Sequence, residues 1–309
     1  MLDRHAKRFL DLLAAAKPQS ALKLSIQERR NAMESLLKFA RPEPVGSIEN
    51  RTVPGPDGSL RVRIYSPAAA HADHAPGLIY FHGGGLVAGS LDTHDAVSRA
   101  LANASACRLV AVDYRLAPEH RFPAAIVDGC AATLWVGAHA KELGIDPHCI
   151  AICGDSAGAT LAAVVCRTIS RSQDMRLAFQ CLICPIMDFA ADTESRRAFA
   201  HGHLVDKATL DHDLLHYLPG HTKPTDPRIS PLRERDLRGL PPTSVHTAEC
   251  DPLRDEGRAY ADRLVLAGVK ASYTCHPGMI HLFYGVSSVI PYARTAMNLI
   301  GAEIRAAMA

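Results

Sequence analysis

The motif GDSAG at residues 154–158 places one serine, Ser156, between two glycines at what looks like a strand-to-helix junction. A serine hydroxyl is a poor nucleophile at neutral pH, because it needs a base to remove its proton and donors to hold the oxyanion that follows. The pattern G-x-S-x-G is typical of a nucleophilic serine on a sharp turn between a strand and a helix. So short a pattern also arises by chance, and the alternative that Ser156 is only a turn residue stays open at this point.

The motif HGGG at residues 82–85 follows another apolar run and is much rarer by chance than GDSAG. Successive glycines allow backbone amides to approach a substrate oxygen closely. One interpretation is a flexible turn. The functional interpretation is an oxyanion hole, formed by the amides of Gly83 and Gly84 together with that of Ala157. Because both motifs follow predicted strands, together they favour nucleophilic catalysis.

The serine would also need a histidine base and an acid that orients it. In enzymes with a nucleophilic serine on such a strand-to-helix turn, the acid precedes the histidine in the sequence. His281, just beyond a predicted strand, is the expected base, and His276 at the end of that strand is its competitor. For the acid we favour Asp251, which lies in a strand-to-helix loop before a proline. Glu249, still within the strand, and Asp255, within the helix, remain alternatives.

Strands and helices alternate from about residue 76, which predicts an α/β protein with a mostly parallel, doubly wound sheet. The strand-like runs are apolar throughout, as expected for strands buried on both faces, and in such sheets sites form at the carboxyl ends of strands. Before them we expect helices within residues 1–40 and an antiparallel hairpin at 47–53 and 59–65, and periodicity fades across 188–240. The expected strands are 75–82, 107–114, 149–153, 177–187, 243–249 and 270–277, and the expected helices are 92–105, 122–143, 157–170, 253–268 and 288–308.

The chain has 309 residues, is 48% hydrophobic and 21% charged, and carries a formal charge of +2, as is ordinary for a soluble globular protein. So small a charge, without clustered Lys and Arg, argues against nucleic acid or an anionic membrane as a partner. No run of 18 or more apolar residues exists, so no membrane span is expected. Near the N-terminus a short apolar run, interrupted by Asp11, favours an amphipathic surface helix over a signal peptide.

Several of the nine cysteines lie within apolar runs, and we interpret them as buried, reduced thiols. Reduced thiols fit a reducing compartment, which predicts a cytoplasmic protein. Cys181 and Cys184 show C-x-x-C spacing without a second pair to match it, so we expect no metal site.

Five stretches together resemble the hormone-sensitive-lipase-like branch of the α/β-hydrolases, and they occur in the order typical of that branch. The resemblance runs from about Val45 to the C-terminus. It implies an α/β-hydrolase fold, with a mostly parallel central sheet, helices on both faces and a helical cap. The cap would comprise residues 1–45 and an insertion at about 188–225, over a catalytic domain spanning 46–309. The five stretches are HGGG, VDYRLAPEHRFPAA at 112–125, GDSAG, AECDPLRDEG at 248–257 and GMIH at 278–281.

The same resemblance implies ester hydrolysis without a metal or cofactor. It assigns the nucleophile to Ser156, the base to His281 and the partner of the base to Asp251, and it places the oxyanion donors on the three amides named above. A homodimer through an edge strand is common in the family and is one expectation here. The charged residues of the stretch at 112–125 are expected to tie loops together: Asp113, Arg115 and Glu119.

The chain departs from the family pattern at three points close to the presumed pocket. Leu86 stands where the family commonly has an aromatic residue, Ala159-Thr160 replaces the usual Gly-Asn, and Leu282 stands where glycine is common. None of these departures removes a catalytic group, so they bear on the choice of substrate rather than on the reaction. We expect Leu86, Asp155 and Leu282 to contact the substrate.

These observations predict a serine carboxylesterase that hydrolyses small esters through an acyl-enzyme. Short to medium acyl chains are favoured, because a capped pocket has a limited volume. An amidase or lactonase with the same triad remains an alternative, since the nucleophilic step is shared. A non-catalytic small-molecule binding protein of this fold is a further alternative, although such proteins typically lack a triad member.

Overall fold

The computed structural model describes residues 1–16, 18–68, 74–172 and 174–309, and its centre is an eight-stranded sheet of order β1-β2-β4-β3-β5-β6-β7-β8. Strands β3 to β8 run parallel to one another, whereas β2 is antiparallel to both β1 and β4. The predicted α/β class with a mostly parallel sheet is therefore confirmed. The strands are β1 (Ser47–Gly55), β2 (Gly58–Ser66), β3 (Ala75–Phe81), β4 (Arg108–Asp113), β5 (Ile145–Asp155), β6 (Phe179–Ile183), β7 (Thr243–Cys250) and β8 (Ala271–Ile280).

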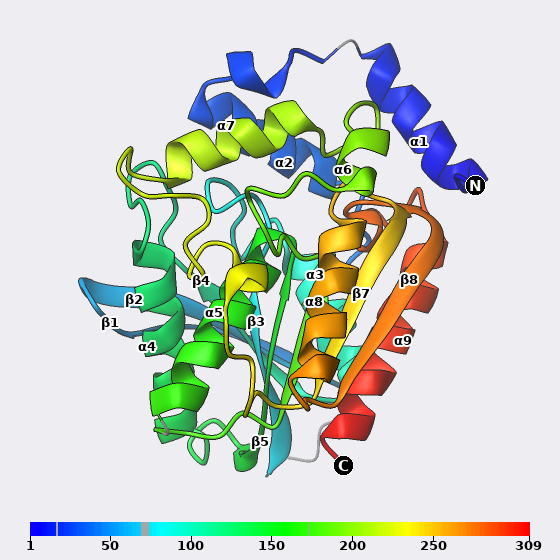
Figure 1. Ribbon diagram of the computed structural model, residues 1–309. Helices are drawn as coiled ribbons and strands as arrows, with labels where there is room; N and C mark the ends of the chain where they lie inside the picture. Colours follow the sequence, from blue (N-terminus) through cyan, green and yellow to red (C-terminus); the bar gives the residue numbers. More distant parts are fainter. Residues whose placement is uncertain (17, 69–73, 173) are drawn as a thin grey trace.

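Helices cover both faces of the sheet (Figure 1). Helices α4, α5 and α8 pack on one face, and α3 and α9 pack against each other on the opposite face. All residues of β6 are buried, which explains why the central strands have continuous apolar sequences. Within the described part of the chain, none of the helices has the length and hydrophobicity to cross a membrane. The five helices are α3 (Asp95–Ser105), α4 (Ala124–Ala138), α5 (Ala157–Ser172), α8 (Arg254–Leu266) and α9 (Tyr292–Ala307).

Four further helices, which we call the upper helices, lie above the carboxyl ends of the parallel strands (Figure 1). Two come from the N-terminal segment and two from the segment in which the sequence periodicity fades. Helix α2 begins with a capping box, in which the Ser25 hydroxyl accepts from the Glu28 amide and the Glu28 carboxylate accepts from the Ser25 amide. The upper helices are α1 (Arg4–Ala15), α2 (Ile26–Leu37), α6 (Glu194–Ala198) and α7 (Lys207–Tyr217).

Several predicted elements differ from the structure in their bounds, for example the helix expected at 288–308, which begins at Tyr292. The strand expected at 177–187 is shorter, because Cys184 takes a φ of 45° and Pro185 has no N–H with which to continue the sheet. The helix expected at 122–143 ends earlier, at Ala138. The strand expected at 149–153 is longer in the structure and continues to the residue before Ser156. The hairpin and the remaining strands occur where the sequence predicts them.

Candidate active site

Ser156 occupies the turn between β5 and α5 and has a φ of 54°. A left-handed backbone is costly for a residue other than glycine and is typical of functional turns. A Cβ at Gly154 would collide with the backbone of Gly158, and a Cβ at Gly158 would collide with the end of β3, so both positions require glycine. The amide of Ser156 donates to the carbonyl of Ile183 at 2.8 Å. The backbone therefore fixes the hydroxyl at the carboxyl edge of the sheet, beside the positive end of α5.

The side chains of His281 and Asp251 reach Ser156 from the ends of two other strands. His281 Nε2 lies 2.9 Å from Ser156 Oγ, and His281 Nδ1 lies 2.7 Å from Asp251 Oδ2. The other carboxylate oxygen of Asp251 accepts from the amide of Leu253 at 2.9 Å. Asp251 is fully buried, His281 is 3% exposed and Ser156 is 9% exposed. The three groups thus form a continuous chain of hydrogen bonds with little access for water.

The partners of His281 define its protonation. A carboxylate only accepts, so Nδ1 of His281 carries the proton and donates to Asp251, and Nε2 is left to accept from the Ser156 hydroxyl. Burial lowers the pKa of His281, but the charge of Asp251 and its hydrogen bond outweigh burial and raise the pKa above its usual value of 6.5. The arrangement can therefore take a proton from the serine and stabilise the imidazolium that results.

The alternative acids and the competing histidine have other partners. Glu249 accepts from the amide of Gly278 at 2.6 Å, and Asp255 accepts from the amide of Ser195 at 2.7 Å. His276 stacks on another histidine, at 5.5 Å between ring centroids, and lies 3.2 Å from the hydroxyl of Tyr292. None of these side chains takes part in the hydrogen-bond chain at Ser156, so the structure brings only Asp251 and His281 to the serine.

The first glycine of the HGGG motif does not offer its amide to a substrate. The amide of Gly83 donates to Asp155 Oδ1 at 2.9 Å, which leaves no hydrogen for an oxyanion. The prediction that Gly83 is an oxyanion donor is therefore wrong. The physical reason lies in the neighbouring strand, because β5 ends with a carboxylate directly beside the exit of β3.

The second and third glycines have a left-handed backbone and amides without a protein acceptor among the described residues. Gly84 and Gly85 have φ values of 118° and 68°, which only glycine adopts readily. No residue in the described ranges accepts from either amide. Ala157 is the first residue of α5, where a helix has no internal acceptor for its N–H groups. The amides of Gly84, Gly85 and Ala157 therefore have no protein acceptor among the described residues, and Gly85 is not one of the donors that the sequence indicated.

Asp155 lies beneath the glycine loop, by which we mean residues 82–88. It is fully buried, and its oxygens accept from the hydroxyls of Tyr80 and Tyr284, the latter at 2.8 Å, as well as from the amide of Gly83. Burial opposes ionisation, but nearby His94 and the two tyrosine hydroxyls outweigh it and lower the pKa of the carboxyl. The expected contact between Asp155 and the substrate does not fit this placement, because protein donors surround the carboxylate. Asp155 instead anchors the start of the loop.

Leu86 directly follows the glycine triplet, and Leu282 directly follows His281. Leu86 has a φ of 64°, and Leu282 has a φ of 60°. Both side chains are almost completely buried. Ser156 and Cys184 also have a positive φ, a conformation that is costly for residues other than glycine and is frequent at functional sites. Contact of the two leucines with the substrate stays a prediction.

One group of side chains near the serine has a donor set that could suit a metal. Within the described residues, only Cys184, Asp251 and His281 bring three potential ligand atoms within 4.8 Å of one another. Asp251 and His281 already use the relevant atoms in their mutual hydrogen bond. We therefore interpret Asp251 and His281 as a hydrogen-bonded pair and not as metal ligands.

The charged residues of the stretch at 112–125 tie loops together, as predicted. Arg115 chelates the buried carboxylate of Asp128, with distances of 2.9 and 2.8 Å. Glu119 accepts from Arg30 of helix α2 at 2.6 Å. Asp113 pairs with an arginine of β2. None of these contacts involves the serine, which confirms their structural role.

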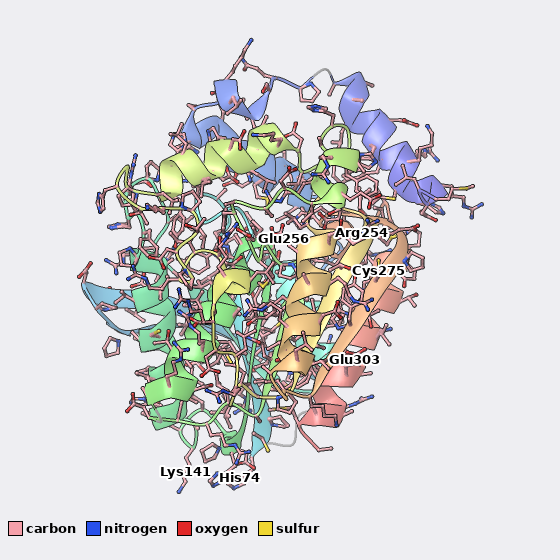
Figure 2. All side chains as sticks on the ribbon, viewed as in Figure 1. His74, Lys141, Arg254, Glu256, Cys275 and Glu303 are labelled. Atoms are coloured by element: carbon pink, nitrogen blue, oxygen red, sulfur yellow. The ribbon has the colours of Figure 1, made fainter. Side chains whose placement is uncertain are left out.

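Glu256, near the upper end of α8, joins three segments beside the site (Figure 2). Its carboxylate accepts from the amides of Met187 and Asp188 at 3.2 and 2.6 Å and from Arg196 Nη2 of α6 at 2.8 Å. Burial raises its pKa to about 7, although the charge of Arg196 works in the opposite direction. Glu256 thus fixes the segment that leaves β6 and connects it to an upper helix.

Comparisons with known proteins agree with this arrangement. Residues 78–285 match the family described as the alpha/beta hydrolase fold. The chain is 42% identical over 257 residues to carboxylesterase NlhH of Mycobacterium tuberculosis, which covers 81% of this chain and 79% of that protein. It is 37% identical over 307 residues to an arylesterase of Saccharolobus solfataricus, with 98% of each chain covered. Among solved structures, the ester-hydrolase EH1AB1 from the metagenome of Lake Arreo is similar, with 41% identity, a TM-score of 0.96 and 99% of each chain covered.

Proposed function

The chain belongs to the hormone-sensitive-lipase-like family of α/β-hydrolases and is a carboxylesterase, and we propose that Ser156 is its nucleophile, His281 its general base and Asp251 the acid that orients the base. The observation that carries the proposal is the chain of hydrogen bonds of 2.9 and 2.7 Å through the imidazole of His281. Distances of this size allow direct proton transfer from the serine hydroxyl.

In the acylation step, Ser156 Oγ attacks the ester carbonyl carbon while its proton passes to Nε2 of His281. The negative charge moves to the former carbonyl oxygen, and we propose that the amides of Gly84, Gly85 and Ala157 hold it there. Asp251 stabilises the imidazolium through its hydrogen bond to Nδ1. The tetrahedral intermediate then collapses, and the alcohol leaves with the proton from Nε2.

In the deacylation step, water takes the place of the alcohol. His281 removes a proton from the water, the resulting nucleophile attacks the acyl-enzyme, and the second tetrahedral intermediate uses the same three amides. The acid product leaves, and the proton returns from Nε2 to the oxygen of Ser156. The reaction needs no group beyond those described.

Labelling with a fluorophosphonate and turnover of p-nitrophenyl esters test the assignment of Ser156. We expect one label per chain in the wild type and none in Ser156→Ala, whose turnover should fall to the residual level that binding and the oxyanion amides provide. Ser244→Ala is a matched control, because Ser244 is also buried but lies outside the site. Turnover by Ser156→Ala at the wild-type rate would remove Ser156 from the mechanism.

We propose short to medium acyl chains for the substrate. Supporting this, Ser156 is only 9% exposed, and the leucines that follow the glycine triplet and His281 are almost completely buried. The relative from Saccharolobus solfataricus is named an arylesterase, so aryl esters of graded acyl length are suitable probes. A panel of such esters, with matched amides and lactones as controls, also tests the amidase and lactonase alternative. Non-catalytic proteins of this fold typically lack a triad member, whereas all three positions are filled here.

Three further proposals concern the whole molecule. The upper helices are proposed to act as a cap, because they lie over the strand ends that carry Ser156 (Figure 1). A reducing, cytoplasmic location is proposed because all nine cysteines are free thiols. A homodimer through the edge strand β8 is proposed because an edge presents unpaired backbone groups, and the molar mass in solution tests it.

A further inference from the structure

Helix α2 carries two adjacent arginines that reach different partners around the glycine loop. Arg30 donates to the carbonyl of Val87 at 2.9 Å and to the carbonyl of Ala117 at 3.2 Å. Arg29 instead forms a bidentate ion pair with Asp213 of α7, with Nε–Oδ1 and Nη2–Oδ2 distances of 3.0 and 2.8 Å. The two side chains of this pair are 13% and 5% exposed, so water screens their charges poorly.

The carboxylate of Asp213 rests directly against Gly85. A Cβ built on Gly85 would collide with the Asp213 carboxylate, so the acid occupies the space that a side chain at this position would need. Gly85 provides one of the amides to which we assign the oxyanion. Asp155 anchors the start of the loop through Gly83, whereas Asp213 of α7 lies against Gly85 in the middle of the loop. The ion pair therefore lies against a residue whose amide we assign to the oxyanion.

A lone carboxylate would be an unfavourable neighbour for a site that must stabilise an anion. Charges in a shielded site interact more strongly than in water, so this repulsion would act mainly on the transition state. The guanidinium of Arg29 neutralises Asp213 at close range. His212 provides a second contact, with its Nδ1 3.1 Å from Asp213 Oδ1 and its Nε2 3.2 Å from the carbonyl of Leu24.

We propose that Arg29 and Asp213 are positioning residues for ester hydrolysis: Asp213 seats Gly85, and Arg29 neutralises Asp213 so that the oxyanion develops beside an ion pair and not beside a lone negative charge. The inference rests on the proposed function, since it assumes that the oxyanion binds to the glycine loop. It connects the N-terminal segment and the insertion after β6 to the chemical step through a single pair of side chains.

The kinetics of Arg29→Met, Asp213→Asn and the double variant test the proposal. We expect Arg29→Met to lower kcat about tenfold with a smaller change in KM, a loss below the 10²–10³ of a direct oxyanion donor because His212 still faces Asp213. Asp213→Asn and the double variant should lose about threefold or less, because neither leaves a lone negative charge. Equal losses for the two single variants would overturn the proposal, since each variant breaks the same ion pair.

Affinity for a trifluoromethyl ketone gives a second readout. This probe adds to the serine and places an oxyanion beside the amides of Gly84, Gly85 and Ala157 without turnover. We expect its affinity to fall in Arg29→Met by the same factor as kcat. Arg29→Lys keeps the charge but loses the bidentate geometry, and should stay near wild type. If Arg29→Lys loses as much affinity as Arg29→Met, geometry and not charge is decisive and the proposal fails.

A matched control for Asp213 lies on the same helix, α7. Asp211 forms an exposed ion pair with Lys207, so Asp211→Asn removes an acid of α7 away from the loop and should leave kcat unchanged. If Arg29→Met does not fold, the double variant is expected to fold with the kcat of Asp213→Asn. Failure of the double variant to fold would show that the ion pair is purely structural.

Labelling by fluorophosphonate distinguishes a failure of the proposed function from a failure of the role proposed for Arg29 and Asp213. An unlabelled Ser156 in the wild type refutes the proposed function, whereas normal labelling with wild-type kinetics in Arg29→Met refutes only this inference.

Discussion

Ser156, Asp251 and His281 are each the first residue after a strand, whereas Arg29 and Asp213 reach each other from within two separate helices. In the centre, the position of each group follows from the backbone hydrogen bonds of the sheet. Between the upper helices it follows from side-chain ion pairs across segments that are 184 residues apart. The sheet therefore fixes the positions of the side chains around Ser156. The contact between the upper helices depends instead on an ion pair, which a change of a single charge can break.

The sheet-fixed centre should respond most strongly to changes in its own side chains. We expect Asp251→Asn to lower kcat by about 10⁴, because the amide no longer holds His281 in the required tautomer or stabilises its cation. The measurement is kcat for p-nitrophenyl acetate, with thermal unfolding to verify the fold. Asp255→Asn is the control, since that carboxylate binds the Ser195 amide, and a larger loss in the control would reassign the acid.

Substitution of Asp155 tests whether a residue beneath the glycine loop contributes to the reaction. Asp155→Asn replaces one acceptor oxygen with a donor, although both oxygens face donors from Gly83, Tyr80 and Tyr284. We expect kcat to fall by about 10²-fold, comparable to the loss of one oxyanion donor, with a smaller change in KM. Tyr284→Phe removes only one of the donors and should lose less. If Asp155→Asn alters KM alone, the residue contacts substrate after all.

Sequence patterns revealed the groups whose positions the sheet fixes. The order of strands and helices predicted the fold, and the ends of β5, β7 and β8 brought Ser156, Asp251 and His281 together as the motifs indicated. A glycine triplet, however, does not reveal which of its amides are free. That depends on the carboxylate of Asp155 at the end of a neighbouring strand, which accepts from the amide of Gly83.

The arrangement of the upper helices was not predictable in the same way. Helix α7 has apolar and polar residues on all sides, so its sequence lacks the periodicity that identifies a surface helix. The pairing of Arg29 with Asp213 depends on how two helices cross in space, and no spacing in the chain encodes it. Of the charged residues in these helices, none carries a motif that distinguishes it from an ordinary surface residue.

The pH dependence of kcat/KM tests the electrostatics of the centre. Activity needs neutral His281, and its pKa is raised above 6.5 by Asp251 in spite of burial. Activity should therefore increase with pH through a midpoint above 6.5 and fall about tenfold per unit below it. In Asp251→Asn the charge is gone and burial dominates, so the midpoint should move below 6.5. A midpoint that is the same in both proteins would mean that Asp251 does not set the pKa of the base.

The smallest expected effect concerns Arg30, which holds helix α2 on the body of the protein without contacting the amides to which we assign the oxyanion. Its guanidinium donates to two backbone carbonyls, those of Val87 and Ala117, and is 25% exposed. We expect Arg30→Met to reduce the free energy of unfolding by about 1–2 kcal/mol, because charged hydrogen bonds to buried carbonyls are lost. Urea unfolding measures this change, and kcat should stay within about threefold of wild type. A large loss of kcat with unchanged stability would place Arg30 beside Arg29 as a residue that acts on the reaction, and the two adjacent arginines would then share one role in place of two.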